Sequence, residues 1–263
     1  MNGPMIDLLH LHQETLFPKL NLSREFICAQ LVFARKMSEL SGISLEDALI
    51  ECTNVRTLLS LRVTRETAHE VPEWRSFVEG LQSAENPDDW AYRFYLKSKE
   101  NETEPKDTDG FGCFWYSYPF RDTPAVRLHF GNIDGSGHGA LSLERADTRR
   151  GELVKLLTEI RTKHPDAKTM RGGSWLYNIE PYRRLFPPEY IASIKAVGYE
   201  LPFWVLWGQF LRGGGKPNHE AIHTFVAAVE QATTPDECEK SFPYQVMRPE
   251  CDIRHFYSYY NIT

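Results

Sequence analysis

The spacing of apolar residues divides the chain into a helical first part and a mixed second part. Up to residue 97, apolar side chains recur at the three-to-four-residue spacing of amphipathic helices. Ser23 and Ser44 stand where N-cap residues are preferred, and Gly42 stands where the first of these helices ends. We expect residues 1–97 to form a helical subdomain, with helices after Ser23 and Ser44 and two more over about 73–81 and 87–97.

A polar segment follows the helices. Residues 98–110 are charged, polar or small, and none of them is large and apolar. Such a segment cannot bury enough surface to order itself. It predicts a loop or a linker between the helical subdomain and a second domain over 111–263.

The second domain alternates between strand-like and helix-like segments. FGCFWYSY (111–118) and AVRLHF (125–130) are rich in aromatic and β-branched residues, as strands are. The apolar segment FWVLWGQFL (203–211) fits a central strand, with a buried helix as the alternative. Further strands are expected over 168–177 and 253–262, and helices over 143–163, 178–185 and 217–232. This succession predicts an α/β (α+β) domain with a mixed sheet.

Composition and charge narrow the class of protein. The 263 residues carry a net charge of −6 and are 41% apolar, which is usual for a soluble globular protein. The negative charge argues against general nucleic-acid binding. No run of about 18 apolar residues occurs, and the first residues lack the features of a secretion signal. We therefore expect no membrane partner and a cytoplasmic location, and five cysteines without a CxxC pair predict reduced thiols.

The stretch KTMRGGSWLYNIEPYRRLFPP (168–188) is the first candidate for a site. Its arginines and tyrosines make poor core material, because buried polar groups need partners, and they suit the wall of a ligand-binding cleft. The alternatives are packing tyrosines and arginines that bind nothing. The candidates are Arg171, Trp175 and Arg183 for holding substrate or cofactor, Tyr177 and Tyr182 for proton donation, and Ser174 as a nucleophile outside a GxSxG motif.

The segment AVRLHF and the glycine-rich loop after it are the second candidate. Loops at strand ends hold ligands in α/β proteins, because free backbone N–H groups point outward there. Asn132, Asp134, Gly135 and Gly137 are therefore candidates for binding an anionic part of a ligand, although neither GxGxxG nor the P-loop pattern is present. His129 is a candidate general base, since its ordinary pKa is about 6.5. A hydrogen-bonded core histidine is the alternative.

Histidine pairs raise the question of a metal. His219 and His223 belong to an HExxH pattern, in which two histidines one helical turn apart bind zinc and the glutamate acts as a general base. Here the pattern stands at a helix start behind a glycine run, and no third ligand has a recognisable spacing. His10 and His12 diverge if their segment is helical. We expect no metal, with His219 and His223 as the alternative zinc ligands.

Residues 111–212 resemble the later part of a GNAT-type N-acyltransferase fold. The resemblance is carried by VRLHFGN, ADTRRGELVKLLTEIRTKHP, AKTMRGGSWLYN and FWVLWGQFL in this order, and SWLYN is similar to an SWLL segment of uncharacterised bacterial members. The resemblance implies an acyl-CoA cosubstrate and a helical region before the domain. The chain departs from the family's Q/R-x-x-G-x-G/A loop, which holds the CoA pyrophosphate, and no catalytic residue is taken from the resemblance.

Three function hypotheses follow. The first is a small-molecule transferase, an acyl-CoA-dependent N- or O-acyltransferase in which His129 is the base and Tyr177 or Tyr182 the acid. The second is a non-catalytic ligand-binding or protein-interaction module on the same fold. The third is a zinc-dependent hydrolase that uses His219 and His223. The sequence determines neither the substrate nor the oligomeric state.

Overall fold

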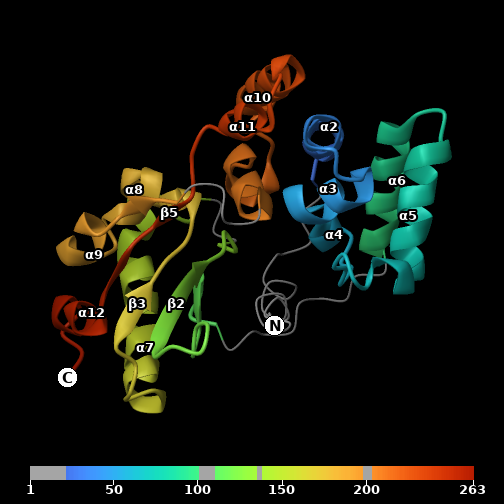
Figure 1. Ribbon diagram of the computed structural model, residues 1–263. Helices are drawn as coiled ribbons and strands as arrows, with labels where there is room; N and C mark the ends of the chain where they lie inside the picture. Colours follow the sequence, from blue (N-terminus) through green and yellow to red (C-terminus); the bar gives the residue numbers. More distant parts are fainter. Residues whose placement is uncertain (1–21, 101–109, 135–137, 198–202) are drawn as a thin grey trace. The chain divides into compact units, whose positions relative to one another are not determined.

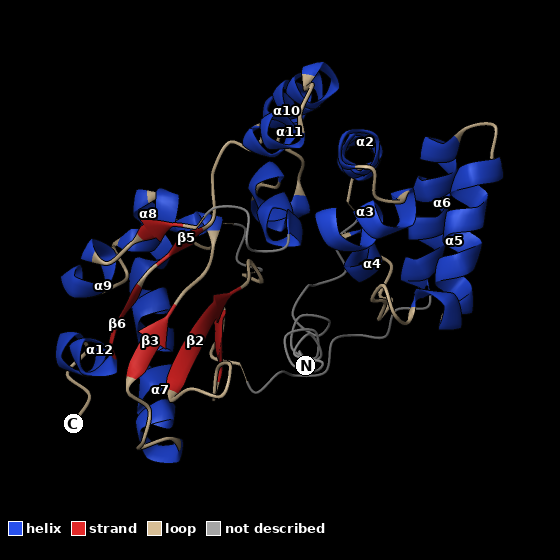
Figure 2. Cartoon of the chain, viewed as in Figure 1, coloured by secondary structure: helices blue, strands red, loops and turns tan. Residues whose placement is uncertain are grey.

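The computed structural model describes residues 22–100, 110–134, 138–197 and 203–263 (Figures 1 and 2). The chain groups into two compact units. Unit 1 comprises residues 1–18, 105–198 and 244–263, and unit 2 comprises residues 19–104 and 199–243. Residues 199–243 thus group with the N-terminal helices, whereas we had expected the whole of 111–263 to form one domain. Most of the expected linker lies outside the described residues, and residues 98–100 belong to a helix.

Unit 2 is helical, as the apolar spacing predicted for its N-terminal part. Ser23 caps the first helix by accepting a hydrogen bond from the Phe26 N–H, and Gly42 ends it with a φ of 72°. Ser44 caps the next helix in the same way. The helices are α2 (Arg24–Ser41), α3 (Leu45–Cys52), α4 (Val55–Leu58), α5 (Pro72–Ser83), α6 (Pro87–Glu100), α10 (His219–Gln231) and α11 (Pro235–Lys240), with shorter 3-10 turns at Ala68–Glu70 and Gly213–Gly215.

The segment FWVLWGQFL is not the central strand that we expected. Phe203–Phe210 forms a 3-10 helix in unit 2, where Trp207 is fully buried. Its ring packs edge-on against Phe33 and Phe225, and its indole N–H donates to the Cys52 carbonyl over 3.0 Å. A segment that is apolar on every side can be buried as a helix or as a strand, and here the helix alternative holds.

Unit 1 contains a four-stranded mixed sheet, which confirms the predicted α/β class. Its strands are β1 (Phe114–Ser117), β2 (Ala125–Phe130), β3 (Thr169–Arg171) and β6 (Glu250–Asp252), in the order β1-β2-β3-β6. β2 and β3 are parallel and the other pairs antiparallel. A second, two-stranded sheet pairs β4 (Lys195–Ala196) with β5 (Met247–Arg248). The helices are α7 (Ala146–Lys163), α8 (Glu180–Arg183), α9 (Pro188–Ala192) and α12 (Ile253–Tyr259), with 3-10 turns at Leu143–Arg145 and Trp175–Asn178.

The two faces of this sheet differ in character. One face packs against α7, which Figure 1 shows behind β2 and β3, and buries Val126, Leu128 and Met170 with the apolar side of that helix. Successive strand residues point to opposite faces. The other face therefore carries the side chains of Ser117, Arg127, His129 and Arg171, and it is the polar face of the sheet.

The end of the chain differs from the expected strand over 253–262. Residues Ile253–Tyr259 form α12, whose N-terminus is capped by the Asp252 carboxylate. Ile253 and Phe256 are three residues apart and both buried, which is a helical spacing. The last strand of the sheet is instead the short β6. The strand expected over 168–177 is also shorter than predicted, because the 3-10 turn Trp175–Asn178 follows soon after β3.

Candidate functional site

The polar face of the sheet brings a serine and a histidine together. His129 Nε2 lies 2.9 Å from Ser117 Oγ, within hydrogen-bonding distance. The imidazole stacks on the ring of Trp115, with centroids 5.4 Å apart and planes 6° from parallel. Both Ser117 and His129 are only partly buried. A hydroxyl held by an imidazole nitrogen is the arrangement in which a base activates a serine nucleophile.

Arg127 lies beside this pair without a counter-charge. It is directly opposite Ser117 in the register of β1 and β2. Only 8% of the residue is exposed, and no carboxylate of a described residue forms an ion pair with it. Its guanidinium lies 5.0 Å from the centre of the Phe120 ring. Burial, together with the positive charges of Arg121 and Arg248, lowers the pKa of Arg127 to about 10. Among the described residues, nothing therefore compensates this cation, and a buried charge without a partner is costly in a folded protein.

A tight turn between β1 and β2 holds Phe120 against Arg127. The Phe120 N–H donates to the Ala125 carbonyl over 3.0 Å, and the Thr123 hydroxyl donates to the Phe120 carbonyl over 2.6 Å. Arg121 has a φ of 54°, in the left-handed region that residues with side chains seldom adopt. Unusual backbone angles persist where surrounding contacts fix them, and they are common at functional sites. The turn places a second guanidinium, that of Arg121, 5.3 Å from the centre of the same ring.

Arg171, a predicted ligand-binding residue, is already paired. Its Nε lies 2.7 Å from one carboxylate oxygen of Glu250, and its Nη2 donates to the other over 3.0 Å. Glu250 is its register partner on β6. Such a bidentate pair fixes both side chains and neutralises both charges. Arg171 therefore occupies space on the polar face but adds no net charge to it.

The other candidates in the stretch 168–188 have structural partners. Ser174 Oγ accepts the Leu176 N–H over 3.1 Å, which makes it a cap of the following turn. Trp175 stacks on Tyr244, with ring centroids 5.9 Å apart. Arg183 is exposed at the end of α8. None of the three is in a described contact with His129 or Ser117.

Tyr177 and Tyr182 lie in the core of unit 1. Each is 2% exposed, and the Tyr177 hydroxyl is 2.9 Å from that of Tyr190. Burial raises the pKa of both phenols well above 10. A phenol that is buried with its hydroxyl against other tyrosine hydroxyls is a packing group rather than a proton donor to a bound molecule.

In the loop after β2, the candidate Asp134 is a buried charge and the candidate Asn132 is an exposed amide. The Asp134 carboxylate is 3% exposed and lies 2.7 Å from Arg145 Nε and 3.1 Å from Arg149 Nη2. Asn132 is exposed. Gly135 and Gly137 lie outside the described residues. Asp134 is thus committed to anchoring the start of α7.

In unit 2, both histidines of the HExxH pattern contact Glu25 of α2. His219 Nδ1 lies 2.5 Å from Glu25 Oε2, and His223 Nε2 lies 3.0 Å from Oε1. Both imidazoles are mostly exposed. Within the described ranges, no group of three or more His, Cys, Asp or Glu side chains is arranged to hold a metal ion. His10 and His12 lie outside those ranges.

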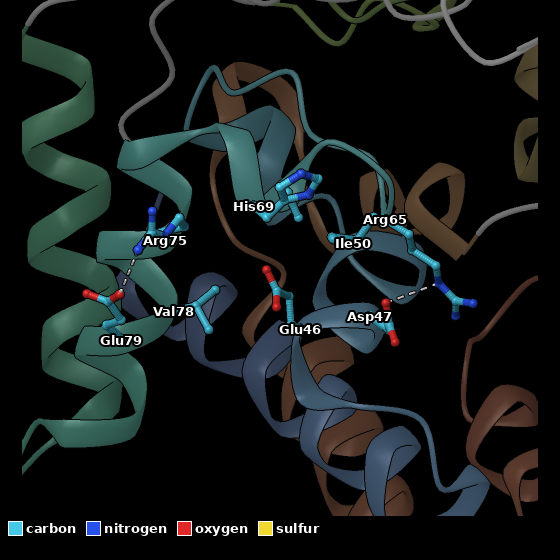
Figure 3. Close-up of a pocket in the computed structure, with 9 residues that line it drawn as sticks. Glu46, Asp47, Ile50, Arg65, His69, Arg75, Val78 and Glu79 are labelled. Atoms are coloured by element: carbon cyan, nitrogen blue, oxygen red, sulfur yellow. Dashed lines mark ion pairs between the residues drawn. The ribbon is translucent and has the colours of Figure 1, made fainter.

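Unit 2 also contains a charged pocket of about 300 Å³, shown in Figure 3. Its ionic side chains have partners. Arg65 Nε lies 3.2 Å from Asp47, Arg75 pairs with Glu79, and Glu46 accepts the indole N–H of Trp74 over 2.9 Å. Both arginines that line the pocket are paired with carboxylates, whereas Arg127 has no such partner among the described residues.

Sequence reasoning found His129 but missed Ser117 and Arg127. The signal was present in the two strands that we expected at 111–118 and 125–130. Antiparallel pairing of these strands places alternate residues of both on one face, and Ser117, Arg127 and His129 share that parity once the register is known. The register depends on the turn between the strands, which the sequence alone left open.

Comparison with protein-family models, curated proteins and solved structures gives no match for this chain. Among the helices that the structure describes, none is both long and apolar enough to cross a membrane.

Proposed function

We propose that the protein is a small-molecule transferase that moves an acyl group, with Ser117 as nucleophile and His129 as general base and acid. The observation that carries the proposal is the 2.9 Å contact between Ser117 Oγ and His129 Nε2 on the polar face of the sheet. Trp115 supports it by holding the imidazole in one plane. Acyl transfer is the reaction class that most often uses a serine hydroxyl paired with a histidine.

The chemistry needs no group other than this pair for its proton transfers. Ser117 Oγ attacks the carbonyl carbon of the acyl donor, and its proton passes to His129 Nε2. The bond to the leaving group then breaks, the leaving group takes the proton from His129, and the acyl group remains as an ester on Ser117. An amine or hydroxyl acceptor attacks this ester and gives its proton to His129. As the acylated product leaves, the proton returns to Ser117 Oγ.

Arg127 gives the donor its orientation. It lies opposite Ser117, so a donor whose anionic group is only a few bonds from its acyl carbon can pair with Arg127 and place its acyl group at the hydroxyl. In this assignment His129 also protonates the leaving group, because Tyr177 and Tyr182 are sealed in the core.

The proposal is tested with the full chain and two acyl donors, p-nitrophenyl acetate and acetyl-CoA. Release of p-nitrophenolate or of free thiol is followed in the wild type and in Ser117→Ala and His129→Gln. We expect both variants to lose turnover by roughly 100-fold or more, since proton transfer by a positioned side chain contributes that much. Ser174→Ala is the matched control and keeps wild-type turnover. Equal turnover in Ser117→Ala and wild type would refute the assignment.

A ligand-binding module without catalysis is the second candidate. The buried charge of Arg127, which no described acid compensates, favours it as much as it favours a transferase, because binding alone would neutralise that charge. In that case Ser117 and His129 position the ligand and no acyl ester forms. The two candidates differ in one outcome, the covalent modification of Ser117.

A further inference from the structure

We infer that Arg121, Arg127 and Arg248 form a binding site for a phosphate or diphosphate group of the substrate. This inference names the substrate class of the proposed site and rests on the proposed function for the substrate's role, but the binding itself can be tested alone. All three residues belong to unit 1. The site is distinct from the glycine-rich loop that the sequence suggested as the anion site.

Arg127 is the centre of the site because it is buried and lacks a counter-charge among the described residues. Arg149, the other deeply buried arginine of unit 1, is neutralised by two carboxylates. Its guanidinium lies 3.1 Å from Asp134 and 2.8 Å from Glu152. Arg127 is similarly enclosed, but the described groups around it are an aromatic ring, two further arginines and the phenol of Tyr177, and none of them is an anion. A buried ion of this kind is normally retained when a binding partner supplies the opposite charge.

Arg248 reaches the same place through the strand register. The Gly172 N–H donates to the Pro249 carbonyl, and the Ser174 N–H donates to the Met247 carbonyl. This pairing sets Arg248 opposite Gly173, with both Cβ directions on one face of the strands. A Cβ on Gly173 would lie 3.6 Å from Arg127 Nη2. Arg248 and Arg127 therefore project toward a common volume in which Gly173 leaves space.

Arg121 supplies the third positive charge. Its guanidinium and that of Arg127 lie 5.3 Å and 5.0 Å from the centre of the Phe120 ring. No described carboxylate pairs with Arg121 or Arg248 either, and Glu250, two residues after Arg248 in the chain, is bound to Arg171. Three guanidinium groups without an acidic partner in the described ranges carry more charge than one carboxylate can neutralise. They match a phosphate or diphosphate, whose oxygens accept several charge-assisted hydrogen bonds.

The test measures binding of inorganic phosphate and inorganic pyrophosphate to the full chain by calorimetry and by thermal shift at constant ionic strength. Acetate is the comparison anion. We expect both phosphates to bind the wild type and to raise its Tm, since a ligand that prefers the native state stabilises it. Arg127→Met and Arg248→Gln should weaken binding by roughly tenfold or more each. Arg127→Lys, which keeps the charge without the planar fork, serves if Arg127→Met does not fold.

Arg150→Gln is the matched control, because Arg150 is an exposed arginine on α7 and its loss changes the net charge equally. Unchanged phosphate affinity in Arg127→Met, or no phosphate binding by the wild type, would overturn the inference. Acetate binding as tight as phosphate binding would overturn the phosphate assignment.

Ser117→Ala separates the inference from the proposed function. It should bind phosphate as the wild type does. Phosphate binding without acylation of Ser117 would remove the proposed function and leave the inference standing, and acylation without phosphate binding would do the reverse.

Discussion

Ser117 lies directly opposite Arg127 in the register of β1 and β2, and Trp115 lies opposite His129 two residues further along the same pair of strands. One hairpin therefore fixes the candidate nucleophile, base and anion-binding residue relative to each other. Such an arrangement does not depend on the placement of distant segments. It also makes the site sensitive to any change in the register of these two strands.

Replacing Arg127 by methionine should have different effects on the stability of the protein and on its binding of phosphate. Methionine keeps the contact with Phe120 and removes a buried charge that no described acid compensates, so we expect the Tm to stay equal or to rise. Phosphate binding should weaken by roughly tenfold or more in the same variant. Thermal unfolding of the anion-free protein measures the first effect.

Arg149→Met is the matched control for that experiment. It removes another buried arginine, which takes the ion pair from Glu152 and one of two ion pairs from Asp134, so it should cost up to roughly 3–5 kcal/mol of unfolding free energy. If Arg127→Met lost as much unfolding free energy as Arg149→Met, Arg127 would be a structural residue.

Gly172 and Gly173 should differ sharply in their tolerance of alanine. A Cβ on Gly172 would lie 2.2 Å from the Tyr177 hydroxyl and 2.5 Å from that of Tyr190, inside the core. Gly172→Ala should therefore lower the unfolding free energy by about 1–3 kcal/mol, as overpacking does. At Gly173 the nearest atom is Arg127 Nη2 at 3.6 Å, an ordinary contact. Gly173→Ala should fold normally and weaken phosphate binding; equal stability of the two variants would contradict this packing.

The core tyrosines should matter for stability and not for turnover. Tyr177→Phe removes the hydroxyl that contacts Tyr190 and should cost about 1 kcal/mol. Chemical denaturation measures the loss, and the ester assay should show an unchanged rate constant for the folded fraction. A rate that falls by orders of magnitude while stability is kept would restore Tyr177 as a catalytic acid.

Glu239 in unit 2 should make stability depend on pH. Burial, and the charge of Asp236 after it, raise the pKa of Glu239 from 4.5 to about 7. The folded state therefore binds the proton more tightly than the unfolded state, and this group lowers stability as pH rises from 4.5 to 7. Glu239→Gln removes the penalty, so its Tm should exceed that of the wild type above pH 7, with no advantage below pH 4.5.

Glu237, two residues before Glu239, should give stability the opposite dependence on pH. Hydrogen bonds from the Thr233 N–H and hydroxyl lower its pKa, so the ionised form is the stabilising one. Glu237→Gln should lower the Tm at neutral pH and have less effect in acid. If both glutamine variants responded to pH alike, the assigned environments would be incorrect.

The sequence correctly predicted those elements whose residue pattern fits only one type of secondary structure. Ser23, Gly42 and Ser44 set the boundaries of two helices through local hydrogen bonds that need no tertiary structure. The segments at 203–211 and 253–262 were assigned as strands and are helical. Their apolar and aromatic residues fit both periods, and packing around Trp207 and Phe256 decided between them.

The site was predictable only in part for a related reason. His129 was recognised because imidazole is a common general base. Ser117 and Arg127 become candidates only when the pairing of β1 with β2 is known, because that pairing places them beside His129. The arginines of the two candidate stretches looked equivalent in the sequence. Only the structure separates Arg171, which is neutralised by Glu250, from Arg127, which is not.

The most direct test of the account is the mass of the intact chain after brief incubation with p-nitrophenyl acetate and quenching in acid. We predict the addition of one acetyl group, located on Ser117 by fragmentation, and no addition in Ser117→Ala. An unmodified wild-type chain, or an acetyl group on another residue that persists in Ser117→Ala, would contradict the assignment of Ser117 and His129 as a nucleophile and its base.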